Sequence, residues 1–479
     1  VRTSGGRLVS RTTVRAKEAP LPARRRALGL LLLAAVVPAT ACSAAGPRAR
    51  SEGPGASATT PVPPLLPAVP ASGAPQAPLP TTAGLSRTLA ARPADPALAG
   101  RVSVVVVDPA TGATLLDHRG AAPVIPASTA KIPTAVAALT ALGPRHRLRT
   151  RVVRDPDGTV VLVGGGDPTL AAPGAPPAYP APARLATLAA ATARALGAGA
   201  TVRVAVDPSR WSGPLTGPGW RPSYLSLGNV RPVRALSVDA GRVRPNGRAR
   251  PAPPGDPAVA AGRAFAGLLT RGGVPVSGGV AIARAAPDAR ELAHVDSPPV
   301  AALVERMLGT SDNDLAEALG REVALRVGQP PTFAGAAAGI RAVVAGLGVD
   351  PGGLRLVDAS GLSRDDRLPP RLLARLLTRA AGDEHPDLRA VVTGLPVAGF
   401  SGTLRPRYAR APERVGAGVV RAKTGTLLGV SALAGIAVDA DGRLLVFALV
   451  ADGVPVTRTL AAQAALDRTA TALATCGCR

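Results

Sequence analysis

A serine and a lysine three positions apart, Ser128 and Lys131, could together carry out covalent chemistry in this sequence. They lie near the start of an apolar segment that predicts a helix ending at about Leu142. In a helix this spacing places the hydroxyl and the amine on one face, one turn apart. A serine becomes a nucleophile when a base takes its proton, and a lysine can be that base when burial disfavours its charged form. The pair therefore predicts acyl transfer to Ser128, provided that the chain supplies the other groups that such a serine needs.

The scarcity of lysine favours this interpretation. The 56 Lys and Arg residues include only three lysines, Lys17, Lys131 and Lys423. Arginine stays charged at any ordinary pH, whereas the pKa of a lysine shifts readily when its side chain loses contact with water. In a chain that otherwise uses arginine, Lys131 and Lys423 indicate two positions where the chemistry requires an amine.

A second candidate group, Ser311-Asp312-Asn313, lies between two predicted helical segments. One interpretation is purely structural, because Ser311 and Asp314 have the spacing of a capping box at a helix start. The functional interpretation gives Ser311 a hydroxyl that relays a proton. Asn313 would then supply an amide that holds a substrate or the lysine.

A third candidate group, Lys423-Thr424-Gly425-Thr426, comes at the end of a predicted strand. The structural interpretation is a simple glycine turn. The functional interpretation is a cation and a hydroxyl that bind a substrate carboxylate, with Gly425 allowing another backbone to approach closely.

The order of the predicted elements indicates an α+β fold, in which helices cover an antiparallel sheet. A hairpin at 102–107 and 114–118 is expected to pair with C-terminal strands at 419–423, 429–438 and 443–450. Helices are predicted over 128–142, 299–308, 312–327, 333–347, 370–381 and 457–474. Pro133 predicts that the first of these helices is either irregular or tightened at its start.

Residues 148–293 have a different texture, with short strand-like pieces, many Gly and Pro residues and a predicted helix at 182–196. We interpret them as a small mixed accessory domain. It would be inserted between two halves of the main domain, residues 83–147 and 294–475.

The first 42 residues have the pattern of a targeting segment. Three consecutive arginines, residues 24–26, precede an apolar stretch and then small residues before Cys42. This pattern predicts export, and cleavage before Cys42 would leave that cysteine for lipidation and a membrane tether. Residues 43–82 are rich in Pro and Ala and predict a semi-extended linker.

Composition narrows the classes of partner. A net charge of +25 could suggest nucleic acid. The arginines are scattered, however, and aromatic residues are only 2% of the chain, so we expect no nucleic-acid partner. We also expect no metal ion or other cofactor, since Cys476 and Cys478 lack the spacing of a metal site.

The three groups, in this order, resemble the signature of active-site serine penicillin-recognising enzymes. Ser128 and Ser311 are 183 positions apart, which leaves room for an inserted domain. The chain resembles the D-alanyl-D-alanine carboxypeptidase/endopeptidase family, the class C low-molecular-mass penicillin-binding proteins, over about residues 85–470. Further stretches carry the resemblance, at residues 164–170, 236–239, 297–299, 358–364, 402–404 and 422–427.

The resemblance implies a role for each candidate residue. Ser128 would be the acyl-accepting nucleophile, Lys131 its general base, and Ser311 the relay that protonates the leaving amine. Asn313 would hold the substrate amide.

At the third group, the resemblance implies that Lys423 supplies positive potential and that Thr424 binds the terminal carboxylate. The backbone N–H groups of Ser128 and Thr426 would form the oxyanion hole. The implied substrates are peptidoglycan peptides ending in D-Ala-D-Ala, the implied inhibitors are β-lactam antibiotics, and the implied location is the cell wall or membrane surface outside the cytoplasm.

Two other functions share parts of this pattern. A serine β-lactamase has the same three motifs, but the chain has no Glu-x-x-Leu-Asn stretch for deacylation and no Tyr-x-Asn in place of Ser311 to Asn313. A catalytically inactive wall-binding protein is disfavoured because the reactive side chains are all present. A Ser-His-Asp hydrolase is disfavoured because the chain has four histidines and no Gly-x-Ser-x-Gly motif.

Overall fold

The computed structural model describes residues 77–89, 92, 95–98, 101–197, 199–243, 250–251 and 255–479. These residues belong to one compact unit. The predicted targeting segment with Cys42, and the predicted linker up to residue 76, lie outside the described residues. Within the described ranges, no helix combines the length and apolar character needed to span a lipid bilayer.

The larger sheet has five antiparallel strands in the order β10-β11-β12-β1-β2. Its strands are β1 (Arg101–Val107), β2 (Thr114–His118), β10 (Arg421–Leu427), β11 (Val430–Val438) and β12 (Leu444–Asp452). The N-terminal hairpin pairs with the C-terminal strands, with Val104 opposite Leu449, as the sequence predicted. The edge strand β10 carries Lys423, so one end of the sheet is available for a site.

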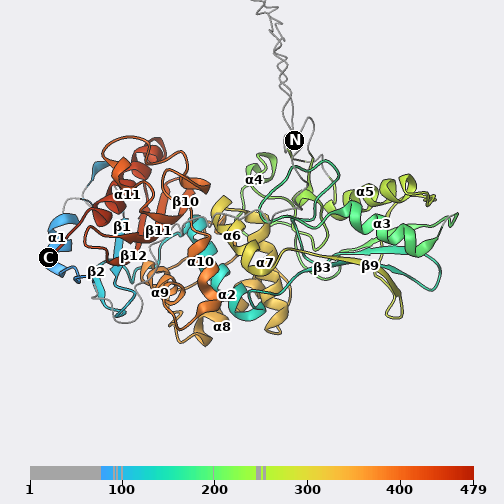
Figure 1. The fold of residues 1–479 in the computed structure, drawn as a ribbon, viewed down its shortest axis with the longest axis horizontal. Coiled ribbons are helices and arrows are strands. Elements are labelled where there is room, and N and C mark those ends of the chain that lie inside the picture. Colours follow the sequence, from blue (N-terminus) through green and yellow to red (C-terminus); the bar gives the residue numbers. More distant parts are fainter. Residues whose placement is uncertain are drawn as a thin grey trace, which may run out of the picture. The chain divides into compact units, whose positions relative to one another are not determined.

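Helices cover both faces of this sheet (Figure 1). Because side chains alternate along a strand, Val104 and Val106 pack with α1 and α11, whereas Val105 and Val107 pack in the core that contains α2. The helices are α1 (Thr82–Leu89), α2 (Lys131–Leu142), α6 (Val300–Thr310), α7 (Asn313–Arg326), α8 (Phe333–Gly346), α9 (Pro370–Ala381), α10 (Arg389–Thr393) and α11 (Thr459–Ala474). This is the α+β arrangement that the order of elements predicted.

A second sheet, with the strand order β8-β5-β4-β3-β9, has its own apolar core. Its strands are β3 (Arg149–Arg154), β4 (Val160–Val163), β5 (Val204–Asp207), β8 (Ala281–Ile282) and β9 (Arg290–Asp296). The pairs β4–β5 and β5–β8 are parallel, and the pairs of β3 with β4 and β9 are antiparallel. The helices α3 (Leu185–Leu196) and α5 (Pro257–Arg271) contribute Leu188 and Phe265 to this core.

Some elements of this region differ from the prediction. The helix expected from residue 182 begins only at Leu185, so Pro182 is not its first residue. Helix α5 was not predicted, although Asp256 caps it by accepting a hydrogen bond from the Ala258 N–H and Pro257 is its first residue. Three short elements, α4 (Pro222–Ser226), β6 (Arg242–Val243) and β7 (Arg250–Pro251), complete the region.

Candidate active site

The segment that carries Ser128 and Lys131 consists of two helices in succession. A 3-10 helix, η2 (Ala127–Ala130), leads directly into α2, whose first residue is Lys131. Pro133 therefore lies in the first turn of α2, where a backbone N–H has no partner within the α-helix. Of the two expectations for Pro133, the structure shows the tightened start.

The backbone before Ser128 adopts an unusual conformation. Ala127 has a φ of 47°, in the left-handed region that non-glycine residues enter at a cost of about 1–3 kcal/mol. Gly361, with a φ of 79°, packs so closely that a Cβ atom there would collide with the Ala127 carbonyl oxygen. The glycine therefore lets the turn at residues 358–363 press against the residue that precedes Ser128.

Lys131 is fully buried, and its amine contacts three oxygen atoms. Its Nζ lies 3.2 Å from Ser128 Oγ, 2.6 Å from Asn313 Oδ1 and 2.7 Å from the Ser360 carbonyl oxygen. Burial lowers the pKa of Lys131 to about 8, against the opposing effect of nearby carboxylates, of which Asp358 is the strongest. The structure thus brings Ser128, Lys131 and Asn313 together, and the lowered pKa gives Lys131 a larger neutral fraction near pH 7 than an exposed lysine would have.

The residues Ser311 and Asp312 shape the junction between α6 and α7. Ser311 has a φ of 58° and ends α6 in the left-handed conformation. Asp312, rather than Ser311, caps α7, because its side chain accepts a hydrogen bond from the Leu315 N–H. The capping-box interpretation of Ser311 with Asp314 is therefore wrong, and the Ser311 hydroxyl is available for another contact.

That contact is with the second buried lysine. Lys423 Nζ lies 3.0 Å from Ser311 Oγ and 2.7 Å from the Thr424 carbonyl oxygen. Burial, with repulsion from Lys131, holds the pKa of Lys423 well below its usual value. Lys131 therefore disfavours the charged form of Lys423, and each lysine has a serine hydroxyl as a partner.

Strand β10 places the rest of the third group beside η2. A Cβ atom on Gly425 would lie 2.8 Å from the Pro126 carbonyl oxygen, so only glycine fits there. The simple-turn interpretation is wrong, since Gly425 lies within the strand, opposite Ala432. The hydroxyl of Thr424 lies 2.8 Å from that of Thr403, and the exposed Thr426 accepts a hydrogen bond from Gln463 Nε2 at 3.1 Å.

Several residues that hold these groups were not predicted from the sequence. Glu317 Oε1 accepts the backbone N–H groups of Ala359 and Ser360, and Asp358 accepts those of Ser360, Gly361 and Ser363. Glu317 lies one helical turn after Asn313, and that spacing was a signal in the sequence.

Two acceptors at the site left no signal, because they are backbone carbonyl groups. One is the Ser360 oxygen that contacts Lys131, and the other is the Asn229 oxygen, which accepts a hydrogen bond from Asn313 Nδ2 at 2.8 Å.

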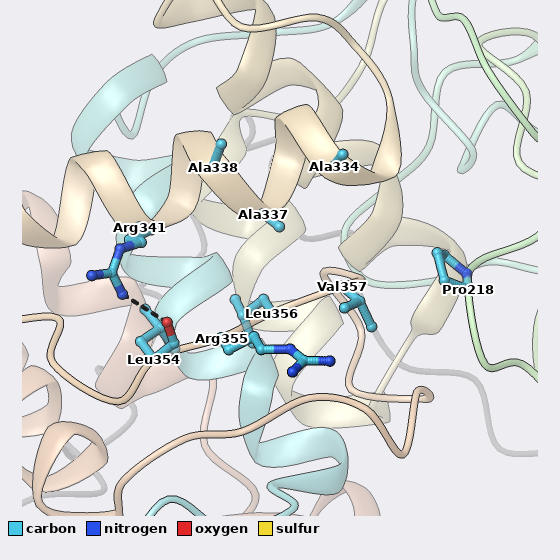
Figure 2. A pocket seen from close by; sticks show the side chains of 9 residues that line it. All are labelled: Pro218, Ala334, Ala337, Ala338, Arg341, Leu354, Arg355, Leu356 and Val357. Atoms are coloured by element: carbon cyan, nitrogen blue, oxygen red, sulfur yellow. Dashed lines mark hydrogen bonds between the residues drawn. The ribbon is translucent and has the colours of Figure 1, made fainter.

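A cavity of about 410 Å³ lies apart from these side chains, between α8 and the segment 354–357 (Figure 2). It is lined by Pro218, Ala334, Ala337, Ala338, Arg341, Leu354, Arg355, Leu356 and Val357. Figure 2 shows Arg341 at one end, where its guanidinium donates to the Leu354 carbonyl oxygen. None of the serines, lysines or threonines described above lines this cavity.

Comparison with known proteins decides the family. The sequence model of the D-Ala-D-Ala carboxypeptidase 3 (S13) family matches residues 85–259 and 254–473. The chain belongs to this family. The peptidase is similar to a carboxypeptidase of Mycobacterium tuberculosis, with 39% identity over 431 residues, which cover 88% of this chain and 90% of that protein. It is also similar to the carboxypeptidase DacB of Mycolicibacterium smegmatis, with 40% identity over 465 residues, which cover 94% and 97% of the two chains.

A solved structure shows the fold as well. Penicillin binding protein 4 of Haemophilus influenzae matches the peptidase with a TM-score of 0.63 and 22% identity, over 78% of this chain and 94% of that chain. The predicted family and fold class are thus confirmed. The enzyme is a serine-type D-Ala-D-Ala peptidase of peptidoglycan.

Proposed function

We propose that the peptidase works through an acyl-serine intermediate formed at Ser128. The observation that carries this proposal is the contact of 3.2 Å between Ser128 Oγ and the buried amine of Lys131. A neutral Lys131 takes the hydroxyl proton as Ser128 Oγ attacks the carbonyl carbon of the D-Ala-D-Ala bond. Burial supports this role, since it lowers the pKa of Lys131 to about 8.

The second lysine and its neighbours act on the other end of the bond. In this proposal Ser311, 3.0 Å from Lys423 Nζ, passes a proton to the leaving amine of the terminal D-alanine. Thr424 binds the terminal carboxylate, and Thr403 orients the Thr424 hydroxyl. Asn313 holds the substrate amide, and the N–H groups of Ser128 and Thr426 bind the oxyanion.

Water then releases the acyl group, which completes a carboxypeptidase or an endopeptidase reaction according to the leaving group. β-Lactams enter the same route, because their ring carbonyl is attacked by Ser128 Oγ and the ring C–N bond opens. With a peptide substrate D-alanine departs, whereas the amine of an opened β-lactam ring stays attached to the acyl group. We therefore expect the β-lactam acyl-enzyme to hydrolyse slowly. This expectation also separates the peptidase from a β-lactamase.

The boundaries of the accessory region are proposed here as the sequence predicts them. We propose that residues 148–293 form a domain inserted between the two halves of the peptidase domain, 83–147 and 294–475. In support, β3, β4 and β5 and the helices α3 and α5 lie within this range and share one apolar core, and β8 pairs with β5 in the same sheet. The last strand, β9, runs three residues past the boundary, to Asp296.

We further propose that the chain is exported and tethered through a lipid on Cys42. The support is the order of arginines, apolar residues and small residues before Cys42, followed by a linker rich in Pro and Ala. The test is expression of the full chain and of Cys42→Ser in a bacterium that processes lipoproteins. The parent is expected in the membrane fraction and Cys42→Ser outside it, whereas equal partition of both proteins would contradict the tether.

The central experiment is covalent labelling by a fluorescent penicillin, combined with two substrate assays. The parent and the control Ser86→Ala, an exposed serine on α1, are expected to be labelled and to release D-alanine from a peptide ending in D-Ala-D-Ala. Ser128→Ala is expected to do neither, and labelling of this variant would contradict the nucleophile assignment. The same proteins incubated with cross-linked wall fragments show the balance between carboxypeptidase and endopeptidase activity.

A further inference from the structure

Besides Ser128, the Lys131 amine has two partners, and both lead back to the accessory region. Asn313 Oδ1 accepts from Lys131, while Asn313 Nδ2 donates to the carbonyl oxygen of Asn229 at 2.8 Å. The Ser360 carbonyl oxygen also accepts from Lys131, and the turn that contains it is bound by Trp220. We call residues 211–229 the accessory loop. The Asn229 oxygen of this loop thus contacts one partner of the proposed base directly, and Trp220 Nε1 reaches the other partner, Ser360, through Asp358.

Asp358 is the link between Trp220 and the Ser360 carbonyl. Its carboxylate is fully buried and accepts N–H groups from Ser360 at 3.1 Å, Gly361 at 2.6 Å and Ser363 at 2.8 Å. Trp220 Nε1 donates to the same carboxylate at 2.7 Å. Because a carboxylate that receives several N–H groups holds them in one arrangement, Asp358 fixes the turn, and Trp220 fixes the carboxylate.

The indole of Trp220 is itself held in place. Its ring meets Phe333 edge to face, with 5.3 Å between the ring centroids. The guanidinium of Arg321 lies 4.0 Å from the centroid of that Phe333 ring, and Arg321 forms a buried ion pair with Glu317. Glu317 accepts the Ala359 and Ser360 N–H groups, so the carboxylates of Asp358 and Glu317 both hold this turn. Trp220, Phe333 and Arg321 connect the two carboxylates.

We propose that Trp220 is a positioning residue for the acylation step, which acts through Asp358 and the Ser360 carbonyl oxygen to aim the Lys131 amine at Ser128. The inference rests on the proposed role of Lys131 as the general base. It assigns the accessory loop a part in catalysis, because the orientation of the base depends on a side chain outside the peptidase domain.

The physical consequence is a loss of rate rather than of substrate affinity. When the Nε1–H donor is removed, one oxygen of the buried Asp358 carboxylate loses a hydrogen bond, and the turn can shift by a fraction of an ångström. Proton transfer depends steeply on the placement of donor and acceptor, and a misplacement of about 1 Å can cost about 100-fold in rate. None of the described contacts of Trp220 is with Ser311, Thr424 or Thr426, which are proposed to act on the substrate.

The test compares Trp220→Phe with Trp211→Phe in the full chain. Trp211 is a matched control, because its Nε1 also donates to a carboxylate, that of Glu322 on α7 at 2.9 Å, and its ring packs in the same apolar cluster as the partly buried ring of Trp220. Each substitution keeps an aromatic ring and removes one N–H donor. The readouts are the thermal midpoint, kcat and KM for release of D-alanine, and the rate constant of labelling by a fluorescent penicillin.

We expect both variants to show similar shifts of the thermal midpoint. Trp220→Phe is expected to lower kcat and the labelling rate by about tenfold with KM unchanged, whereas Trp211→Phe leaves all three near the parent values. Trp220→His, which restores a ring N–H donor, is expected to recover part of the rate.

Three outcomes would overturn the inference: equal rates in Trp220→Phe and the parent, equal losses in both phenylalanine variants, or a rise in KM with kcat unchanged. The last result would make Trp220 a substrate-binding residue. The proposed function is tested separately by Ser128→Ala, so labelling of that variant would contradict the nucleophile, whatever Trp220→Phe does.

Discussion

The Nζ atom of Lys131 lies 3.2 Å from the Oγ atom of Ser128, although the two residues belong to different helices. Ser128 lies in the 3-10 helix η2, and Lys131 begins α2. In a 3-10 helix residues three apart eclipse one another, so the tightened segment aligns the two side chains. Pro133 fits this arrangement because α2 starts only two residues before it.

Lys131→Arg is expected to abolish acylation although it keeps a positive charge. Arginine cannot give up its proton at an ordinary pH, so it cannot accept the proton of Ser128. The rate of labelling by a fluorescent penicillin should fall by about 100-fold or more. Lys17→Arg makes the same chemical change in the predicted targeting segment and serves as the control. Labelling of Lys131→Arg within a few-fold of the parent would exclude the general-base role.

The rate of acylation is expected to rise with pH through about pH 8. Burial lowers the pKa of Lys131 to about 8, so the neutral amine that acts as a base is a minority form below that pH and the major form above it. The labelling rate should fall about tenfold for each pH unit well below 8 and level off above it. Rates measured between pH 6 and pH 10 check this, and a rate that rises toward acid pH would contradict it.

Gly425→Ala is expected to damage the site more than the stability. The added Cβ atom would lie 2.8 Å from the Pro126 carbonyl oxygen and 3.0 Å from the Ala432 Cβ, so β10 must move away from η2. We expect a loss of about 100-fold in acylation, from misplacement of the groups on β10. Gly346→Ala, where a Cβ atom meets nothing within 4 Å, is the control and should keep the parent rate. A labelling rate of Gly425→Ala equal to that of the parent would show that acylation does not require the close approach of β10 to η2.

Thr403→Val is expected to weaken the reaction at the terminal carboxylate. The Thr403 hydroxyl lies 2.8 Å from that of Thr424, and valine removes it with little change of shape. A lost hydrogen bond of about 1 kcal/mol should lower kcat/KM for D-alanine release by about fivefold to tenfold. Thr403→Ser keeps a hydroxyl and should restore most of the activity. If valine and serine behave alike, the contact has no part in binding the carboxylate.

The strands and helices that position the site were predictable from local patterns. A run of valines marked β1, the turn-forming residues after it marked the hairpin with β2, and Pro370 marked the start of α9 at the residue where the structure begins it. The pairing of β1 with β12 followed from the need of two strand groups to share one sheet. The predictions were poorest in the accessory region, where α5 was missed and α3 begins later than expected, because Gly and Pro loops obscure the boundaries.

The sequence by itself determined which residues could do the chemistry. Ser128 and Lys131 are close in the chain, so the geometry of one helical turn sufficed to place them on one face. The scarcity of lysine then drew attention to Lys423. These conclusions depend on residue type and short spacing, and both are visible in the amino-acid sequence.

Only the tertiary structure decided what surrounds them. The burial that lowers the pKa of Lys131, the contact of Lys423 with Ser311, and the carbonyl groups of Ser360 and Asn229 come from segments far apart in the sequence. A backbone carbonyl has no residue type, and desolvation depends on everything packed around a group. No local pattern could therefore report either of them.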